Sequence, residues 1–173
     1  MKVAPSLIHR LFYPQVPLVL AAMSGGRVSA MPVVSYFSAS EHPPTVGVAC
    51  ASGGFTCGLS VKAGSFSLSV LDASLADKVS KLARTSGKNV KDKLTEVGLA
   101  HTRGRAVAAP VLNDAVATLE CSLVSSAKAG DHTVLMGKVE AAYASPAFKD
   151  SWNYAKYTPI LYTGWKDGLT LYG

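Results

Sequence analysis

Short apolar stretches separated by glycine and proline dominate the pattern of hydrophobic and polar positions along the chain. In SFSLSVL, the stretch Ser65–Leu71, large apolar residues alternate with serines, as in a strand with one buried face. Other stretches predict further strands: Leu18–Ala22, Arg27–Val34, Thr45–Ala51, Ala117–Val124 and Thr133–Ala142. Pro32 places the second of these at a sheet edge or a bulge. The spacing predicts a mainly β (α+β) fold, a closed or nearly closed antiparallel barrel.

Helical spacing occurs between some of these strands. Thr56–Lys62 follows a glycine-rich turn and predicts one or two helical turns, with Thr56 as the cap. A longer amphipathic pattern begins at Asp72, and Asn89–Val97 predicts a second short helix. The lead-in Pro5–Tyr13 fits a helix or an extended segment equally well. These elements predict short helices inserted into a β fold.

The stretch Pro32–Thr56 concentrates the candidate chemistry. Ser35–Ser40 holds serines and two aromatic residues and predicts a polar corner, and a Gly-Gly turn precedes Thr56. Backbone N–H groups in such a turn form an anion-binding concavity. The stretch therefore suits a planar ligand with an anionic tail. From these residues alone, a plain strand pair with a hydroxyl-rich loop is the preferred interpretation, and the ligand site is the alternative.

Composition narrows the possibilities. The 173 residues predict one domain, 1–173, and carry a formal net charge of +6, which favours an anionic partner. Three cysteines without a CxxC motif predict buried free thiols in a reducing, cytoplasmic compartment. The apolar run Val16–Met23 is too short to span a bilayer and is interpreted as a buried strand. No metal site, Rossmann motif or P-loop is found.

Five segments in this order resemble the flavin reductase-like, FMN-binding split-barrel family, most closely its flavoredoxin and ferric-reductase branch. They are LFYPQVPLVLAA at Leu11–Ala22, MPVVSYFSASEHPP at Met31–Pro44, Ala51–Leu71, RTSGKNVKDKLTEVGL at Arg84–Leu99, and Leu119–Val139. The resemblance covers most of the chain. It implies an antiparallel split barrel that binds FMN, with FAD as a possible replacement, at a homodimer interface. It also implies NAD(P)H as a possible electron donor and a small molecule or protein as electron acceptor.

The resemblance also assigns roles to residues. Near the flavin ring it places Ser29, Ala30, Ser35, Tyr36, Phe37 and Trp165, with Ser40 holding the corner. At the phosphate it places Ser52, Thr56, Lys88 and Lys93, with Lys91 as another candidate. His132 would lie beside the flavin or the incoming donor. The sequence departs from the family where Ser35 replaces an aromatic residue, Ser29 an asparagine and Phe55 a basic residue.

Alternatives remain open for several of these assignments. Thr56 has a plain interpretation as a helix cap, Lys93 as an exposed helix charge, and His132 in Gly-Asp-His as part of a turn. The protein as a whole could be an electron carrier without NAD(P)H activity. A basic barrel that binds nucleic acid is a further alternative, but the strands lack the aromatic and basic residues of a stacking surface. We therefore expect neither a nucleic acid nor a membrane partner.

Overall fold

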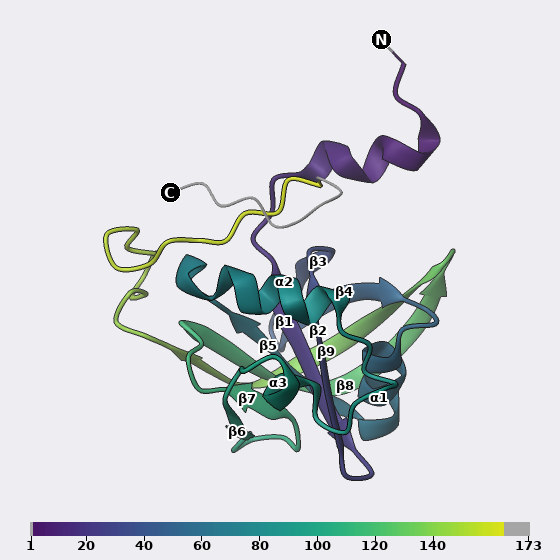
Figure 1. Ribbon diagram of the computed structural model, residues 1–173. Coiled ribbons are helices and arrows are strands. Elements are labelled where there is room, and N and C mark those ends of the chain that lie inside the picture. Colours follow the sequence, from purple (N-terminus) through teal and green to yellow (C-terminus); the bar gives the residue numbers. More distant parts are fainter. Residues whose placement is uncertain (1, 165–173) are drawn as a thin grey trace.

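Seven antiparallel strands form one sheet in this computed structural model, which describes residues 2–164. The order across the sheet is β2-β1-β5-β8-β9-β4-β3 (Figure 1). Their bounds are β1 Leu18–Ser24, β2 Arg27–Val33, β3 Tyr36–Glu41, β4 Pro44–Ala51, β5 Ser65–Val70, β8 Ala117–Ala129 and β9 His132–Ala144. A separate ladder joins β6 (His101–Arg103) to β7 (Pro110–Leu112).

The sheet curves so that its two end strands are neighbours in sequence. Only Val34 and Ser35 separate β2 from β3, although these strands lie at opposite ends of the sheet order. The N–H of Ala49 in β4 donates to the carbonyl of Ser35 (2.8 Å) and ties this connection to the far end of the sheet. No ladder joins β2 to β3 within the described sheet. The arrangement is a split barrel, which confirms the predicted fold class, and β2 lies at an edge, as Pro32 predicted.

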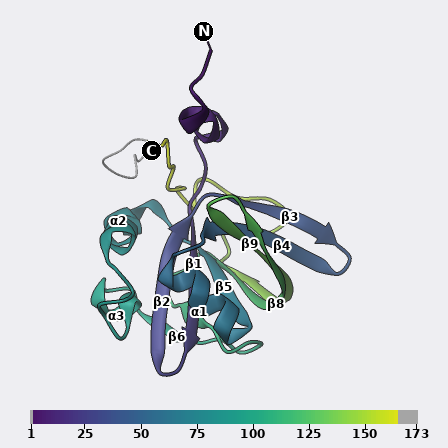
Figure 2. The same ribbon diagram turned by 90° about the vertical axis from the view of Figure 1, so that its right-hand side faces the viewer.

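Short helices fill the ends and one side of this barrel. They are the 3₁₀ helices η1 Pro5–Phe12 and η2 Ala73–Leu75, and the α-helices α1 Phe55–Ala63, α2 Ala76–Arg84 and α3 Lys93–Glu96. Figure 2 shows α2 and α3 on one side of β2, and α1 in front of β1 and β5. The η1 segment projects away from the body, and none of its residues is buried (Figure 1). Within residues 2–164, no helix is long and apolar enough to cross a membrane.

Strand β1 is buried on both faces. Leu20 packs into the barrel interior with residues such as Phe66, whereas Val19 packs into a second cluster outside the barrel. That outer cluster includes Leu82 of α2 and Leu94 of α3. Burying a leucine or valine side chain stabilises the fold by about 1.5–3 kcal/mol. The continuous apolar run in the sequence therefore reflects a strand with a core on either side.

Several sequence predictions need correction. The predicted polar corner Ser35–Ser40 is instead strand β3, because its backbone pairs with β4, where Tyr36 lies opposite Val48. The predicted helix Asn89–Val97 reduces to α3. Strands β6 and β7 were missed, because each is only three residues long.

The serine face of β5 is also buried, so the prediction of a half-buried strand is wrong there. Ser67 donates to the carbonyl of Pro110, and Ser65 donates to the carbonyl of Ala108 (3.3 Å). These hydroxyl groups are satisfied by the loop that packs over them, which removes the penalty of burying them.

Glu120 of β8 organises the loop between β6 and β7. The side chain is 1% exposed, and its carboxylate accepts backbone N–H groups from Arg105 (3.1 Å), Ala106 (2.7 Å) and Val107 (3.0 Å). Burial alone raises the pKa of Glu120, but these N–H groups and the nearby Arg105 charge outweigh it, so the pKa lies below its ordinary value. The ionised carboxylate thus fixes the loop.

We expect Glu120→Gln to lower the free energy of unfolding at pH 7 by about 1–3 kcal/mol, because charge-assisted, partly buried bonds from three backbone N–H groups are weakened. The lowered pKa means that the carboxylate stabilises the fold above its ordinary pKa of 4.5 and that this contribution is lost as pH falls through the lowered value. Urea unfolding from pH 7 to pH 3 measures both effects. The matched control is Glu140→Gln, an exposed carboxylate; equal losses in the two variants would contradict the prediction.

Candidate functional site

Two clefts meet at Met31 of β2. The larger, of about 1010 Å³, is here called the aromatic cleft and is bounded by η1, the β2–β3 connection and the tip of the β8–β9 hairpin. The smaller, of about 300 Å³, is called the anion cleft and is bounded by the start of α1 and the loop between α2 and α3. Met31 lines both clefts, so the two adjoin at this residue. The residues that line the anion cleft are Met31, Gly53, Gly54, Phe55, Thr56, Thr85, Ser86, Gly87, Lys88 and Lys93.

The start of α1 forms one wall of the anion cleft. Gly54 is the N-cap residue and has no side chain, so the prediction of Thr56 as the cap is wrong. Thr56 lies inside the first turn, where its Oγ1 and the Oγ of Ser29 are 2.9 Å apart. Both side chains are buried. The first turn of a helix presents backbone N–H groups without partners in the helix, and these favour an anion.

Lys93 forms the opposite wall and is 5% exposed. Its Nζ donates to the carbonyl of Ala30 at 2.7 Å, and no carboxylate within 4.0 Å pairs with it among residues 2–164. Burial lowers the pKa of Lys93 to about 8. The interpretation of this lysine as an exposed helix charge is therefore wrong. A buried ammonium without a counter-ion is costly, and an anion in the cleft would offset that cost.

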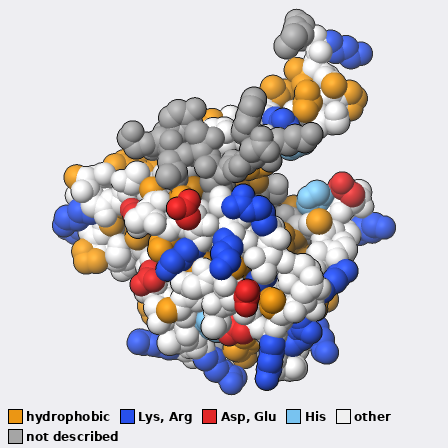
Figure 3. Space-filling view, in the orientation of Figure 1, with side chains coloured by type: hydrophobic (Ala, Val, Ile, Leu, Met, Phe, Trp, Pro, Cys, Tyr) orange, Lys and Arg blue, Asp and Glu red, His pale blue; other side chains and the backbone are white. Residues whose placement is uncertain are grey.

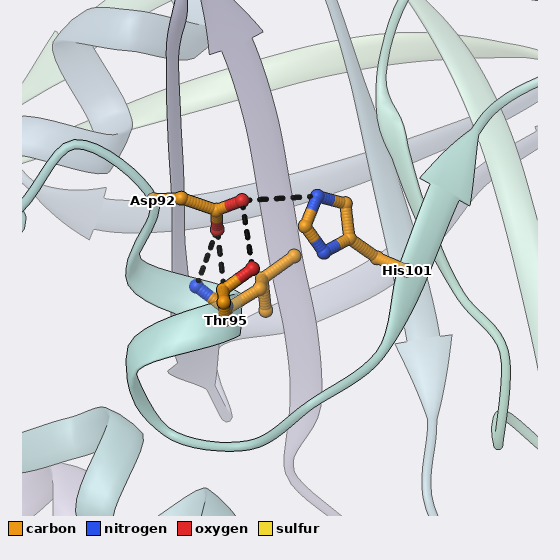
Figure 4. A network of polar contacts seen from close by, with 4 residues as sticks. Asp92, Thr95 and His101 are labelled. Atoms are coloured by element: carbon orange, nitrogen blue, oxygen red, sulfur yellow. Dashed lines mark hydrogen bonds and ion pairs between the residues drawn. The ribbon is translucent and has the colours of Figure 1, made fainter.

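A capping network holds Lys93 in place (Figure 4). Asp92 Oδ1 accepts the N–H groups of Leu94 (3.0 Å) and Thr95 (3.1 Å), and Oδ2 accepts the hydroxyl of Thr95 (2.9 Å). His101 Nε2 lies 3.4 Å from the same carboxylate. This cap starts α3 at Lys93 and so fixes the direction from which the ammonium enters the cleft.

Tyr36, Phe37 and Ser35, which the resemblance assigns to the flavin ring, line the aromatic cleft. The hydroxyl of Tyr36 donates to the carbonyl of Val16 at 2.7 Å, and burial raises its pKa, so it stays protonated. Phe37 is 50% exposed. In this part of the cleft, the Tyr36 ring is therefore fixed by its hydrogen bond, and the Phe37 ring beside it is half exposed.

The N-terminal segment forms the opposite wall of the aromatic cleft. His9, Phe12 and Tyr13 line it, and the Tyr13 ring packs edge-on against Tyr162 at 4.8 Å between centroids. Figure 3 shows hydrophobic side chains on this segment, which stands above the body of the molecule. The cleft therefore offers apolar ring surfaces on both sides, which suits a flat ligand.

His132 lies at the tip of the β8–β9 hairpin and faces the aromatic cleft. Its Nδ1 is 2.7 Å from Asp131 Oδ1, and its side chain is 45% exposed. This hydrogen bond lowers the pKa of Asp131. The geometry places an imidazole within the cleft and also satisfies the turn, so the two interpretations from the sequence are compatible.

Three further predicted residues, Ala30, Ser40 and Ser52, line neither cleft. Ala30 is buried and contributes its carbonyl to Lys93, and Ser40 in β3 lines neither cleft. Ser52 Oγ is 3.0 Å from Thr133 Oγ1, and its N–H donates to Asp131, so it braces the hairpin tip from outside the lining. Trp165 falls outside the described residues.

Sequence reasoning missed Arg27, Met31 and Asp92. Met31 joins the clefts, Arg27 binds the loop that carries Lys88, and Asp92 caps α3. Only Asp92 carries a local signal, since an aspartate that precedes Thr95 by three residues is a common N-cap arrangement.

The cysteines are free and buried, as predicted. Cys50 lines the aromatic cleft, but burial raises its pKa and keeps it as an unreactive thiol. In the described part of the chain, no cluster of three or more histidine, cysteine or acidic side chains could hold a metal ion.

Residues 9–164 match the model of the flavin reductase like domain. The chain belongs to this family. The match confirms the family inferred from the five segments and makes the protein a flavin reductase-like oxidoreductase in general terms. It spans both clefts and most of the residues that line them.

Individual relatives agree with this membership. A protein of Aeropyrum pernix is 35% identical over 158 residues, which cover 91% of this chain and 60% of the relative's length. An NADH-dependent flavin reductase from Pseudomonas fluorescens is 32% identical over 131 residues, or 76% of this chain and 72% of that protein. Among solved structures, an FMN-binding protein from Thermus thermophilus with bound 1-cyclohex-2-enone has a TM-score of 0.81 and 29% identity, covering 99% of this chain and 92% of that one.

The lowered pKa of Lys93 predicts pH-dependent anion binding. We expect the affinity for sulfate, whose own charge is constant in this range, to fall as pH rises through about 8, because the ammonium loses its proton there. Calorimetric titration from pH 6.5 to 9.5 measures this dependence.

Lys93→Met is the control for this prediction, since methionine keeps the apolar stem without the charge. We expect weak sulfate binding with no inflection near pH 8. An inflection that persists in Lys93→Met would assign the titration to another group.

Proposed function

We propose that this protein binds FMN across the two clefts, with the phosphate in the anion cleft and the isoalloxazine ring in the aromatic cleft. The observation that carries the proposal is that the two clefts adjoin at Met31, with aromatic side chains lining one and a buried ammonium in the other that has no carboxylate partner among residues 2–164. The FMN-binding relative from Thermus thermophilus supports the choice of flavin. FAD is the alternative cofactor.

The donor set of the anion cleft fits a phosphate. Lys93 and Lys88 supply positive charge, Thr56 supplies a hydroxyl group, and the first turn of α1 supplies backbone N–H groups. Among residues 2–164, no acidic side chain lines this cleft. A lysine–phosphate contact of this kind contributes about 1.5–3 kcal/mol as a charge-assisted hydrogen bond. In this proposal, these residues bind the cofactor tightly by its tail and leave its ring accessible.

The aromatic cleft positions the ring and limits the access of water. Tyr36 is anchored through Val16, so it offers a fixed ring, and Phe37 and Tyr13 cover opposite sides. Ser35 places a hydroxyl group in the lining for the polar edge of the ring. When bound, the flavin supplies the redox chemistry, while the protein supplies orientation and a local polarity.

The donor in this proposal is NAD(P)H, and the acceptor is free flavin, ferric iron or a partner protein. The NADH-dependent flavin reductase from Pseudomonas fluorescens supports a nicotinamide donor. His132 faces the aromatic cleft from the hairpin tip, where its imidazole can hydrogen-bond a polar group of a stacked donor. An electron carrier without NAD(P)H activity would use the same clefts and is distinguished by the kinetic test below.

We further propose a cytoplasmic homodimer in which a second copy covers the aromatic cleft. Phe37 of the aromatic cleft is exposed. Four apolar side chains of the projecting η1 segment are exposed as well: Leu7, Ile8, Leu11 and Phe12. A second apolar surface laid over them would remove them from water. Sedimentation of the purified protein tests the dimer, and a monomer at micromolar concentration contradicts it.

We expect the purified protein to be yellow or to take up one FMN per chain on titration, with a visible flavin spectrum. A colourless protein that shows no flavin fluorescence change on titration would refute the proposal. Stopped-flow mixing with NADH and with NADPH then separates the two functions. Rapid bleaching near 450 nm indicates a reductase, and slow bleaching with both donors indicates a carrier.

For His132→Ala, we expect at least about tenfold slower bleaching by the preferred nicotinamide at saturation, because a hydrogen bond to the donor is lost. The FMN dissociation constant should change much less than the bleaching rate, since His132 lines the aromatic cleft but not the anion cleft, which holds the phosphate in this proposal. The matched control is His42→Ala, which removes an exposed histidine between β3 and β4 that lines neither cleft. If the bleaching rate of His132→Ala equals that of the parent, His132 does not contact the donor and serves only the turn.

A further inference from the structure

Arg27, the first residue of β2, binds the loop between α2 and α3 at three points. Its Nη2 donates to the carbonyl groups of Gly87 (2.6 Å), Val90 (2.7 Å) and Lys88 (3.1 Å). The next residue of β2 adds a backbone bond, from the N–H of Val28 to the carbonyl of Lys91 (3.0 Å). The loop therefore has no ladder partner of its own but is held by one guanidinium and the edge of one strand.

The same guanidinium also contacts the opposite wall of the anion cleft. Its central carbon lies 4.8 Å from the ring centroid of Phe55, the first residue of α1. Gly87 packs closely against this wall, since a Cβ atom there would meet the Oγ of Ser29 and approach the Phe55 ring to 2.7 Å. Arg27 thus joins the loop to the helix, and the cleft is the space enclosed between them.

The Nη2 group of Arg27 is hydrogen-bonded, but the positive charge of the guanidinium has no carboxylate partner among residues 2–164. The Nε–H of Arg27 is buried without a partner, and no carboxylate within 4.0 Å pairs with the guanidinium in the described chain. Arg27 does not line the cleft, so it acts on a ligand through the loop and through its field. Together with Lys93, it makes the region strongly favourable for an anion.

We infer that Arg27 is a positioning residue that shapes the anion cleft by clamping residues 87–90 against the start of α1. The identity of the anion as the FMN phosphate rests on the function proposed above, whereas the clamp itself does not. A planar guanidinium donates to the loop carbonyl groups and at the same time offers a flat face to the Phe55 ring, which a lysine ammonium does not provide. The clamp therefore requires arginine and not merely a positive charge.

Limited trypsin digestion tests the clamp directly, because Lys88 and Lys91 are cleavage sites within the loop. Mass spectrometry follows cleavage after these two lysines in the folded, flavin-free protein. We expect Arg27→Gln to be cut about tenfold to a hundredfold faster than the parent, and Arg27→Lys to fall between them, since an ammonium can donate to the loop carbonyl groups but has no flat face for the Phe55 ring. Inorganic phosphate should slow cleavage in the parent and much less in Arg27→Gln.

Arg103→Gln is the matched control, because Arg103 is an exposed arginine on β6, away from the anion cleft. It should be cut within the loop at the parental rate. If Arg27→Gln does not fold, as judged by circular dichroism, Arg27→Lys decides the question. Parental cleavage rates in the folded Arg27 variant would overturn the clamp.

A second measurement separates this inference from the proposed cofactor. We expect Arg27→Gln to weaken FMN binding by about tenfold to a hundredfold and Arg27→Lys to weaken it less, because the cleft opens. If the parent binds no FMN, the proposed function fails while faster loop cleavage in Arg27→Gln still supports the clamp. If the parent binds FMN and the loop is equally protected in all variants, the clamp fails alone.

Discussion

The buried ammonium of Lys93 is the interaction on which the site depends. It lies against the carbonyl of Ala30, out of reach of any carboxylate in the described chain, in a protein that has few charged residues overall. Such a group is tolerated only if neighbouring structure fixes it firmly. Asp92 supplies that restraint by capping α3, and the outer core cluster around Leu94 holds α3 against β2.

The site is built from a strand edge rather than from a loop alone. Arg27, Ser29 and Met31 are alternate residues of β2, so they share one face, while Val28 and Ala30 belong to the outer cluster beneath α2 and α3. On this face, Met31 lines both clefts, while Ser29 and Arg27 contact the walls of the anion cleft. The opposite face anchors α2 and also α3, the helix that carries Lys93. The rigidity of the barrel is thereby transmitted to the cleft walls, which suits a site that must hold a ligand in a defined orientation.

Much of the fold could be predicted from the sequence, because its main signals are local. Alternation in Ser65–Leu71 and continuous apolar residues in Thr45–Ala51 identify strands without knowledge of their partners. The stretch Ser35–Ser40 was misinterpreted because its strand state comes from pairing with β4. The tripeptide strand β6 was missed because three residues show no period.

The candidate site was predictable only in part. Tyr36 and Thr56 stand near marked sequence features, and the structure places them in adjoining clefts. Arg27 contacts carbonyl groups about sixty positions away along the chain. Because every residue has a backbone carbonyl, the sequence does not indicate which ones accept these bonds. The burial of Lys93 likewise depends on how α3 docks, which no local pattern of charges reveals.

The alternation of β2 has a consequence for how the gene can vary. Substitutions at single positions change one contact, but a deletion of one codon between Arg27 and Met31 would rotate every later side chain of the strand to the opposite face. The Ser29 hydroxyl, which contacts Thr56, and the Met31 thioether, which lines both clefts, would then point at the helices. Length variation among homologues should therefore be confined to the Gly25–Gly26 turn, where both residues have positive φ and no neighbour crowds them.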